Sequence, residues 1–173
     1  MSEFILDTNV FNKILDNKID ISKFLELGHK YYVTHIQRDE ILNTKADERR
    51  HSLIALFFDI VDLNIPTESA VVGVSRVGGA KIIPTESAVF GVSCWGQCKF
   101  TAKNNLFEPI KDALDKIKNK KNNLQDALIA ETSIKNGYIL ITNDVNLATI
   151  VKDYNGKVLS FNEFYKSHFK KYE

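Results

Sequence analysis

Hydrophobic positions along the chain follow two rhythms, which predict two kinds of element. Short apolar runs typical of buried strands occur at 4–6, 31–34, 138–141 and 157–161. Apolar residues spaced by three and four predict amphipathic helices over 10–15, 21–27, 106–117, 124–136 and 145–153. The same spacing predicts two helices between 35 and 62, hinged near 44–47, and a terminal helix from Asn162. Strands separated by helices indicate an α/β fold with a parallel sheet covered on both faces.

Polar residues and glycines at the ends of these segments predict where helices begin and end. Asp7 or Thr8 can cap the first helix, because side-chain oxygens at that position accept free backbone N–H groups. Gly28 and Gly137 each follow a helical pattern, which suits a left-handed C-terminal cap.

The middle of the chain holds a tandem duplication. Residues 65–82 and 83–100 align without a gap and agree at 12 of 18 positions. Two units are too few for a solenoid, which needs about three to bury a continuous core. Alternation at Ala70, Val72 and Val74 and the glycines at 78–79 predict strand and hairpin. We therefore expect an inserted β-ribbon, 65–100, on the edge of the domain.

Composition and charge narrow the class of protein. A length of 173 residues suits one domain, 1–173, and a net charge of +1 gives no overall basic signature. Any contact with nucleic acid must therefore come from a local patch. No apolar run approaches the about 18 residues of a membrane span, and no signal peptide begins the chain, so we expect a cytoplasmic protein. Cys94 and Cys98, with no histidine nearby, make a poor zinc site and are interpreted as reduced packing residues.

Acidic residues occupy equivalent places after predicted strands. Asp7 follows the first strand, Asp144 follows the third, and Asp126 lies in the first turn of a helix. Each alone is more easily explained as a carboxylate that offsets a helix dipole. Adjacent parallel strands end in one crevice, however, and carboxylates gathered there favour a hard cation such as Mg²⁺ or Mn²⁺. From spacing alone, Glu40 is a solvated helix acid.

Four stretches together resemble the acidic motifs of PIN-domain ribonucleases, in the order found in VapC-type toxins. They are Ile5-Leu6-Asp7-Thr8-Asn9, Arg38-Asp39-Glu40-Ile41-Leu42, the segment Gln125-Asp126-Ala127-Leu128-Ile129-Ala130-Glu131-Thr132, and Leu140-Ile141-Thr142-Asn143-Asp144-Val145-Asn146-Leu147. The resemblance implies a three-layer α/β/α fold with a five-stranded parallel sheet. It also implies a Mg²⁺ or Mn²⁺ site lined by Asp7, Glu40, Asp126 and Asp144, an RNA substrate, a homodimer and an antitoxin partner.

Two departures from the family pattern affect these expectations. Many members carry an acid at the place of Asn146, so the number of metals, one or two, stays open. The 18-residue unit occurs once in the relatives, so the surplus copy is expected to have no catalytic role.

The metal-assisted hydrolysis expected here assigns roles to several side chains. Asp7 and Asp126 are expected as direct ligands, Asp144 as a direct or water-mediated ligand, and Glu40 as a ligand or a water-orienting base. Thr8 and Thr142 either orient carboxylates or cap helices, and Asn9 and Asn146 are weaker candidates. Candidate RNA contacts, each equally explained as part of a solvated face, are Arg38, Arg49, Arg50, Lys118, Lys120 and Lys121.

Two other functions stay open at this point. One is a PIN-fold binding protein without catalytic activity. The other is an α/β phosphatase with an aspartyl nucleophile at Asp7, although that mechanism favours a second acid where this chain has Asn9.

Overall fold

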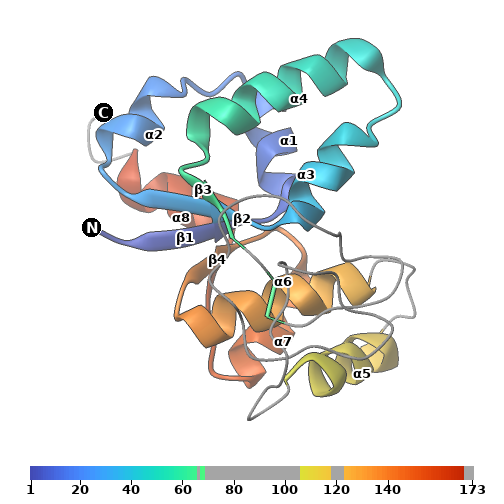
Figure 1. Cartoon of the computed structure of the whole chain (residues 1–173). Coiled ribbons are helices and arrows are strands. Elements are labelled where there is room, and N and C mark those ends of the chain that lie inside the picture. The colour runs from blue at the N-terminus through green and yellow to red at the C-terminus, as the bar shows by residue number, and fades with distance from the viewer. Residues whose placement is uncertain (66, 69–105, 118–122, 170–173) are drawn as a thin grey trace.

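Five parallel strands form the centre of the molecule. The structure is a computed structural model that describes residues 1–65, 67–68, 106–117 and 123–169. The sheet has the order β3-β2-β1-β4-β5 (Figure 1). Its strands are β1 (Glu3–Leu6), β2 (Lys30–Val33), β3 (Leu63–Asn64), β4 (Ile139–Ile141) and β5 (Lys157–Leu159). The four strands expected from the sequence pattern are confirmed, as is the five-stranded parallel sheet implied by the family resemblance.

The fifth strand, β3, was not found from the hydrophobic pattern. It is two residues long and pairs with β2 at the edge of the sheet. In the sequence, β3 is marked only by the alternation of Val61, Leu63 and Ile65 with polar residues. This alternation directly follows the hydrophobic pattern of α4, with no glycine or proline between them. A strand this short falls below the length at which alternation is informative.

Eight helices occur in the described part of the chain, and they cover the sheet on both faces. They are α1 (Thr8–Asp16), α2 (Ser22–Glu26), α3 (His35–Leu42), α4 (Asp47–Ile60), α5 (Phe107–Ile117), α6 (Asn123–Asn136), α7 (Val145–Asp153) and α8 (Phe161–His168). The expected hinge at 44–47 separates α3 from α4. Gly28 and Gly137 have positive φ angles of 60° and 71°, which confirms both left-handed caps.

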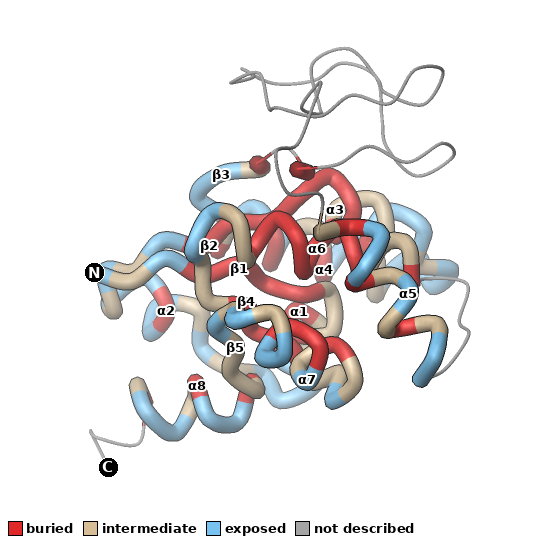
Figure 2. The backbone as a smooth tube through the Cα atoms, turned by 90° about the horizontal axis from the view of Figure 1, so that it is seen from below, coloured by how far each residue is buried: buried red, intermediate tan, exposed pale blue. Residues whose placement is uncertain are grey.

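Alternation along the strands divides the core into two layers. Phe4 and Leu6 point into one cluster with α1, α2, α4 and α8. Ile5, between them, points into a second cluster with α5, α6 and α7. Figure 2 shows burial concentrated in β1, α1 and α6, while α2 and α8 lie on the outside. The expected α/β/α arrangement of three layers is therefore confirmed.

The last strand is shorter than the sequence pattern predicts. It ends at Leu159 rather than 161, and α8 begins at Phe161 rather than at Asn162. The cause is a capping box, in which the Ser160 hydroxyl accepts the Glu163 backbone N–H and the Glu163 carboxylate accepts the Ser160 N–H. The apolar Phe161 belongs to the helix because this cap precedes it.

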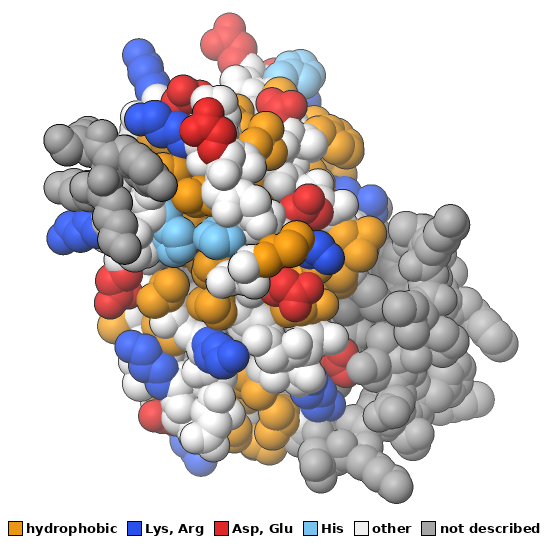
Figure 3. All heavy atoms as spheres, turned by 90° about the vertical axis from the view of Figure 1, so that its left-hand side faces the viewer, with side chains coloured by type: hydrophobic (Ala, Val, Ile, Leu, Met, Phe, Trp, Pro, Cys, Tyr) orange, Lys and Arg blue, Asp and Glu red, His pale blue; other side chains and the backbone are white. Residues whose placement is uncertain are grey.

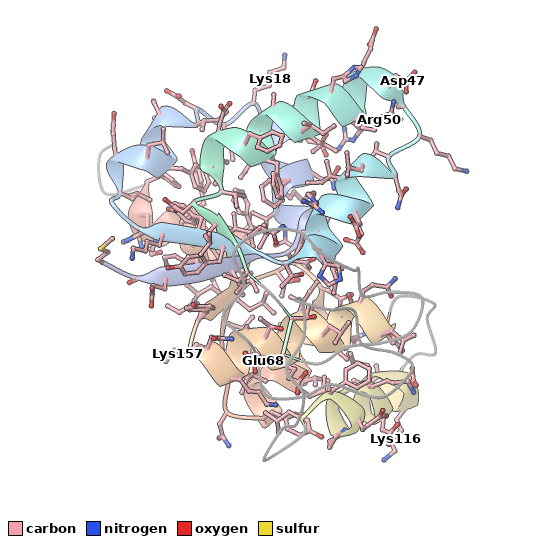
Figure 4. The ribbon with its side chains drawn as sticks, viewed as in Figure 1. Lys18, Asp47, Arg50, Glu68, Lys116 and Lys157 are labelled. Carbon is pink, nitrogen blue, oxygen red and sulfur yellow. The ribbon has the colours of Figure 1, made fainter. Side chains whose placement is uncertain are left out.

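The start of the duplicated segment is anchored to the domain. The Ile65 N–H donates to the Val33 carbonyl at 2.7 Å, and the Glu68 N–H donates to Thr132 Oγ1 at 3.2 Å. Asn136 Nδ2 donates to Glu68 Oε1 at 3.0 Å, and Figure 4 shows Glu68 beside α6. Most of the expected β-ribbon lies outside the described residues, as do both cysteines. No helix in the described ranges is long and apolar enough to cross a membrane.

Candidate active site

Asp7 and Thr142 follow the two central strands at the place where the sheet changes winding direction. In the order 3-2-1-4-5, β1 and β4 are neighbours although most of the chain separates them. Open α/β sheets bind ligands outside the carboxyl ends of such strands. The Asp7 N–H donates to the Ile141 carbonyl at 3.0 Å, which extends the ladder past the end of β1. The sheet itself thus fixes the Asp7 backbone.

A hydrogen-bond network holds the Asp7 carboxylate, which is 7% exposed. Thr142 Oγ1 donates to Asp7 Oδ2 at 2.6 Å, and Asn9 Nδ2 donates to the same oxygen. The Asn143 N–H donates to Asn9 Oδ1 at 3.1 Å. Asp7 occupies the cap position of α1 but makes no side-chain capping hydrogen bond. Its carboxylate therefore belongs to a polar network that spans two strand ends, and Asn9 has a larger part in it than the sequence indicated.

The surroundings of Asp7 disfavour its ionised form. Burial, together with the nearby carboxylates of Glu40 and Asp144, raises the pKa of Asp7 to about 6, although hydrogen bonds from the Thr142 hydroxyl and the Thr8 backbone N–H act in the opposite direction. Within the described residues, no lysine or arginine forms an ion pair with Asp7. Among the described residues, the charge of Asp7 thus has no cationic partner.

Glu40 joins this group although spacing alone favoured a solvated position. The Thr8 hydroxyl donates to Glu40 Oε2, and burial raises the pKa of Glu40. Of the two roles expected for Thr8, orienting a carboxylate or capping a helix, this hydrogen bond corresponds to the first.

Gln37 connects α3, the helix that carries Glu40, to the strand that ends before Asp7. It is wholly buried, and its Nε2 donates to the Leu6 carbonyl at 3.0 Å. Its Oε1 accepts from the Thr34 N–H at 2.9 Å and from the Thr34 hydroxyl at 2.6 Å. Gln37 was not predicted from the sequence to support the site. Its only sequence signal is its spacing from Thr34, which is that of a capping box.

The remaining acids have different surroundings. Asp144 Oδ1 accepts the Asn146 and Leu147 N–H groups at 2.9 and 3.1 Å, so it caps α7 as well as facing Asp7. Asp126 is half-buried in the first turn of α6, which packs on β4. Asn146 is half-buried at the second position of α7 and contributes its backbone N–H to the cap.

The candidate RNA-binding residues are spread over the molecule. Arg49 donates to Asp16 and Asn12, and Arg50 pairs with Asp47 and also donates to the Thr44 carbonyl. The Nε of Arg38 lies 4.0 Å from Asp39.

Lys118, Lys120 and Lys121 lie outside the described residues. Figure 4 shows Arg50 and Lys116 far apart, and Figure 3 shows acidic and basic side chains interspersed on the face that carries the chain ends.

The donor set fits a hard divalent cation by its chemistry. Among the described residues, no three histidine, cysteine, aspartate or glutamate side chains are gathered closely enough to hold a metal together. Mg²⁺ commonly binds through one or two carboxylates and keeps several waters, so it does not need such a group. Asp7, crowded by two other acids, has the uncompensated charge that a cation would neutralise.

Comparison with known proteins shows a likeness at the level of the fold. The chain matches no protein-family model, and no curated protein matches it. Among solved structures, it resembles a chain in the crystal structure of VapBC2 from Rickettsia felis bound to a DNA fragment from their promoter. The TM-score is 0.52 and the identity 19%, over 91% of this chain and 98% of that chain. The chain therefore shares the fold of a VapBC2 component.

Proposed function

We propose that this chain is a Mg²⁺- or Mn²⁺-dependent endoribonuclease and the toxin of a type II toxin–antitoxin pair. The observation that supports this most strongly is the buried Asp7 carboxylate, which faces Glu40 and Asp144 with no basic partner in the described structure. The VapBC2 neighbour supports a cognate antitoxin as a partner. A homodimer, as in the resembling family, is part of the same proposal.

In this proposal the candidate site residues have different roles in hydrolysis. Asp7 and Asp126 would hold the cation directly, and Asp144 would hold it directly or through water. Thr142 and Asn9 fix the Asp7 carboxylate through the hydrogen bonds described above. A bound cation would lower the pKa of a water and stabilise charge on the phosphate.

Glu40 is suited to accepting a proton from the attacking water or to binding the cation. Its pKa is raised by burial, which brings a carboxylate nearer to the pH at which a general base works. Thr8 holds one of its oxygens, which restricts the direction in which the other can accept.

The phosphatase alternative receives no support from the contacts of Asp7. Asn9 stands where that mechanism wants an acid, and its amide donates to the Asp7 carboxylate. The binding-protein alternative differs from the proposal only in lacking cleavage, so it is an outcome of the following experiment.

The test is cleavage of single-stranded RNA by the purified chain with Mg²⁺, Mn²⁺ or EDTA. Asp7→Asn and Asp126→Asn are expected to lower cleavage by about 10³-fold or more while the far-ultraviolet circular dichroism stays unchanged. Asp59→Asn is the matched control, because Asp59 is exposed on α4, and it should cleave like the parent. Parental cleavage by either site variant contradicts the proposal, and a parent that binds Mn²⁺ without cleaving supports the binding-protein alternative.

A further inference from the structure

An open groove of about 270 Å³ begins at the candidate active site and continues away from it. Thr142 and Asp144 belong to both the site and the groove. From there the groove passes between α7, which contributes Thr149 and Lys152, and the start of α8, which contributes Glu163. This volume is just below the about 300 Å³ at which small-molecule sites typically begin, so the open groove can hold only a small group, such as part of a single nucleotide.

The two acids in the groove do not make it repel an anion strongly. Asp144 accepts two backbone N–H groups at the start of α7. Glu163 accepts the Ser160 N–H and hydroxyl, both at 2.7 Å, and these bonds, together with the nearby charge of Lys152, lower the pKa of Glu163. Both carboxylates thus lie against the positive ends of helices. Among the described lining residues, Lys152 is the cation, and its side chain is exposed.

An unused hydrogen-bond donor lies in the same lining. Asn143 Oδ1 accepts the Phe161 N–H at 3.2 Å, but its Nδ2 is buried and has no acceptor. Buried donors are nearly always paired, so this N–H needs an acceptor, which a water or a ligand oxygen in the groove can supply once the amide turns toward it. A base carbonyl or a ribose hydroxyl would satisfy it.

An apolar surface completes the groove next to the catalytic candidates. Val145 directly follows Asp144 and is 76% exposed, and Ala148 lies one turn further along α7 in the same lining. The face of an unpaired base can pack on such side chains, whereas the bases of a duplex are stacked on each other and not available.

We propose that this groove binds one nucleotide of single-stranded RNA beside the scissile phosphate, with the base on Val145, a polar edge at Asn143 and a phosphate at Lys152. The proposal rests on the proposed function for the identity of the substrate. It adds a binding subsite that lies outside the cluster of acids.

The test measures binding of a fluorescent single-stranded RNA oligonucleotide by anisotropy in EDTA, where no cation supports cleavage. Lys152→Ala is expected to weaken binding about 3- to 10-fold and to reduce the slope of log K against log salt by about 0.7, the value for one lost phosphate contact. Val145→Ser is expected to weaken binding without changing that slope.

Lys157→Ala is the matched control, because Lys157 is also an exposed lysine but lies at the opposite end of β5 (Figure 4). Its binding should stay within about twofold of the parent, since Lys157 is not part of the groove lining. Equal weakening by Lys152→Ala and Lys157→Ala would overturn the subsite, as would a parent that binds no RNA. If Lys152→Ala and Val145→Ser both cleave RNA with the parental KM, the subsite is rejected but the proposed function is not. Groove-dependent binding without cleavage rejects the proposed function alone.

Discussion

Two almost wholly buried acids, Asp7 and Glu131, show how differently this fold treats a negative charge. Glu131 lies in the middle of α6 with no exposed surface, and its Oε1 is 2.9 Å from Lys135 Nζ one turn further along the same helix. Asp7, at the end of β1, instead faces two further carboxylates. Glu131 has a lysine as its ion-pair partner, although neither of its oxygens has a hydrogen bond of good geometry, whereas no described lysine or arginine pairs with Asp7. We conclude that an uncompensated buried acid, and not burial itself, distinguishes the candidate site.

The uncompensated charge has a cost for folding. Raising the pKa of Asp7 from 3.8 to about 6 makes its ionisation in the folded protein less favourable by about 3 kcal/mol. Natural structures keep such destabilised groups mainly where function requires them. This cost leads to opposite predictions for neutralising the two acids.

The largest effect is expected from Glu131→Gln, which leaves Lys135 without its partner. Lys135 is 17% exposed, so it cannot regain full hydration, and the free energy of unfolding should fall by about 3 kcal/mol. Urea unfolding at pH 7.5 measures the change. The double variant Glu131→Gln, Lys135→Gln should recover most of the loss, and a single variant as stable as the parent would contradict the comparison.

Asp7→Asn is expected to change stability in the opposite direction, by about 2 kcal/mol at pH 7.5 without divalent cations. The variant removes the cost of ionising a buried carboxylate, although its amide matches the Thr142 and Asn9 bonds less well. Thermal unfolding in EDTA measures the gain. A destabilised variant would show that the Asp7 charge is compensated after all.

The pH dependence of this gain provides a second check. The folded pKa of Asp7 lies above its unfolded value, so parental stability rises as the pH falls through about 6, because the folded chain then binds a proton that the unfolded chain does not. The advantage of Asp7→Asn should therefore be full above pH 6 and vanish near pH 4. The same protonation should weaken Mn²⁺ binding below pH 6.

The sequence could predict this site only as far as backbone topology reaches. Asp7 and Thr142 follow apolar runs that form parallel strands, and the pairing of β1 with β4 brings the ends of these strands together. The position of Glu40 depends on how α3 lies against β1, which is set by packing and not by periodicity. Only the family resemblance gave Glu40 a place in the site. The groove beside α7 was missed because its members come from α7, β5, α8 and the turns before the two helices, and because the helical spacing of 145, 148, 149 and 152 is that of any helix face.

Gln37 hydrogen-bonds α3 to the end of β1, and changing it gives the smallest predicted effect. Gln37→Leu removes the bond to the Leu6 carbonyl and both bonds from Thr34, so the free energy of unfolding should fall by about 1.5 kcal/mol. A positioning role for Gln37 predicts that Gln37→Leu weakens Mn²⁺ binding, measured by calorimetry, when Glu40 is present. The same substitution should then leave Mn²⁺ binding unchanged in a protein that already carries Glu40→Gln. Gln37→Glu, which keeps the oxygens that accept from Thr34, separates the cap from the bond to Leu6. Equal weakening in both backgrounds would mean that Gln37 supports the fold generally, and that the acids around Asp7 are not held together by α3.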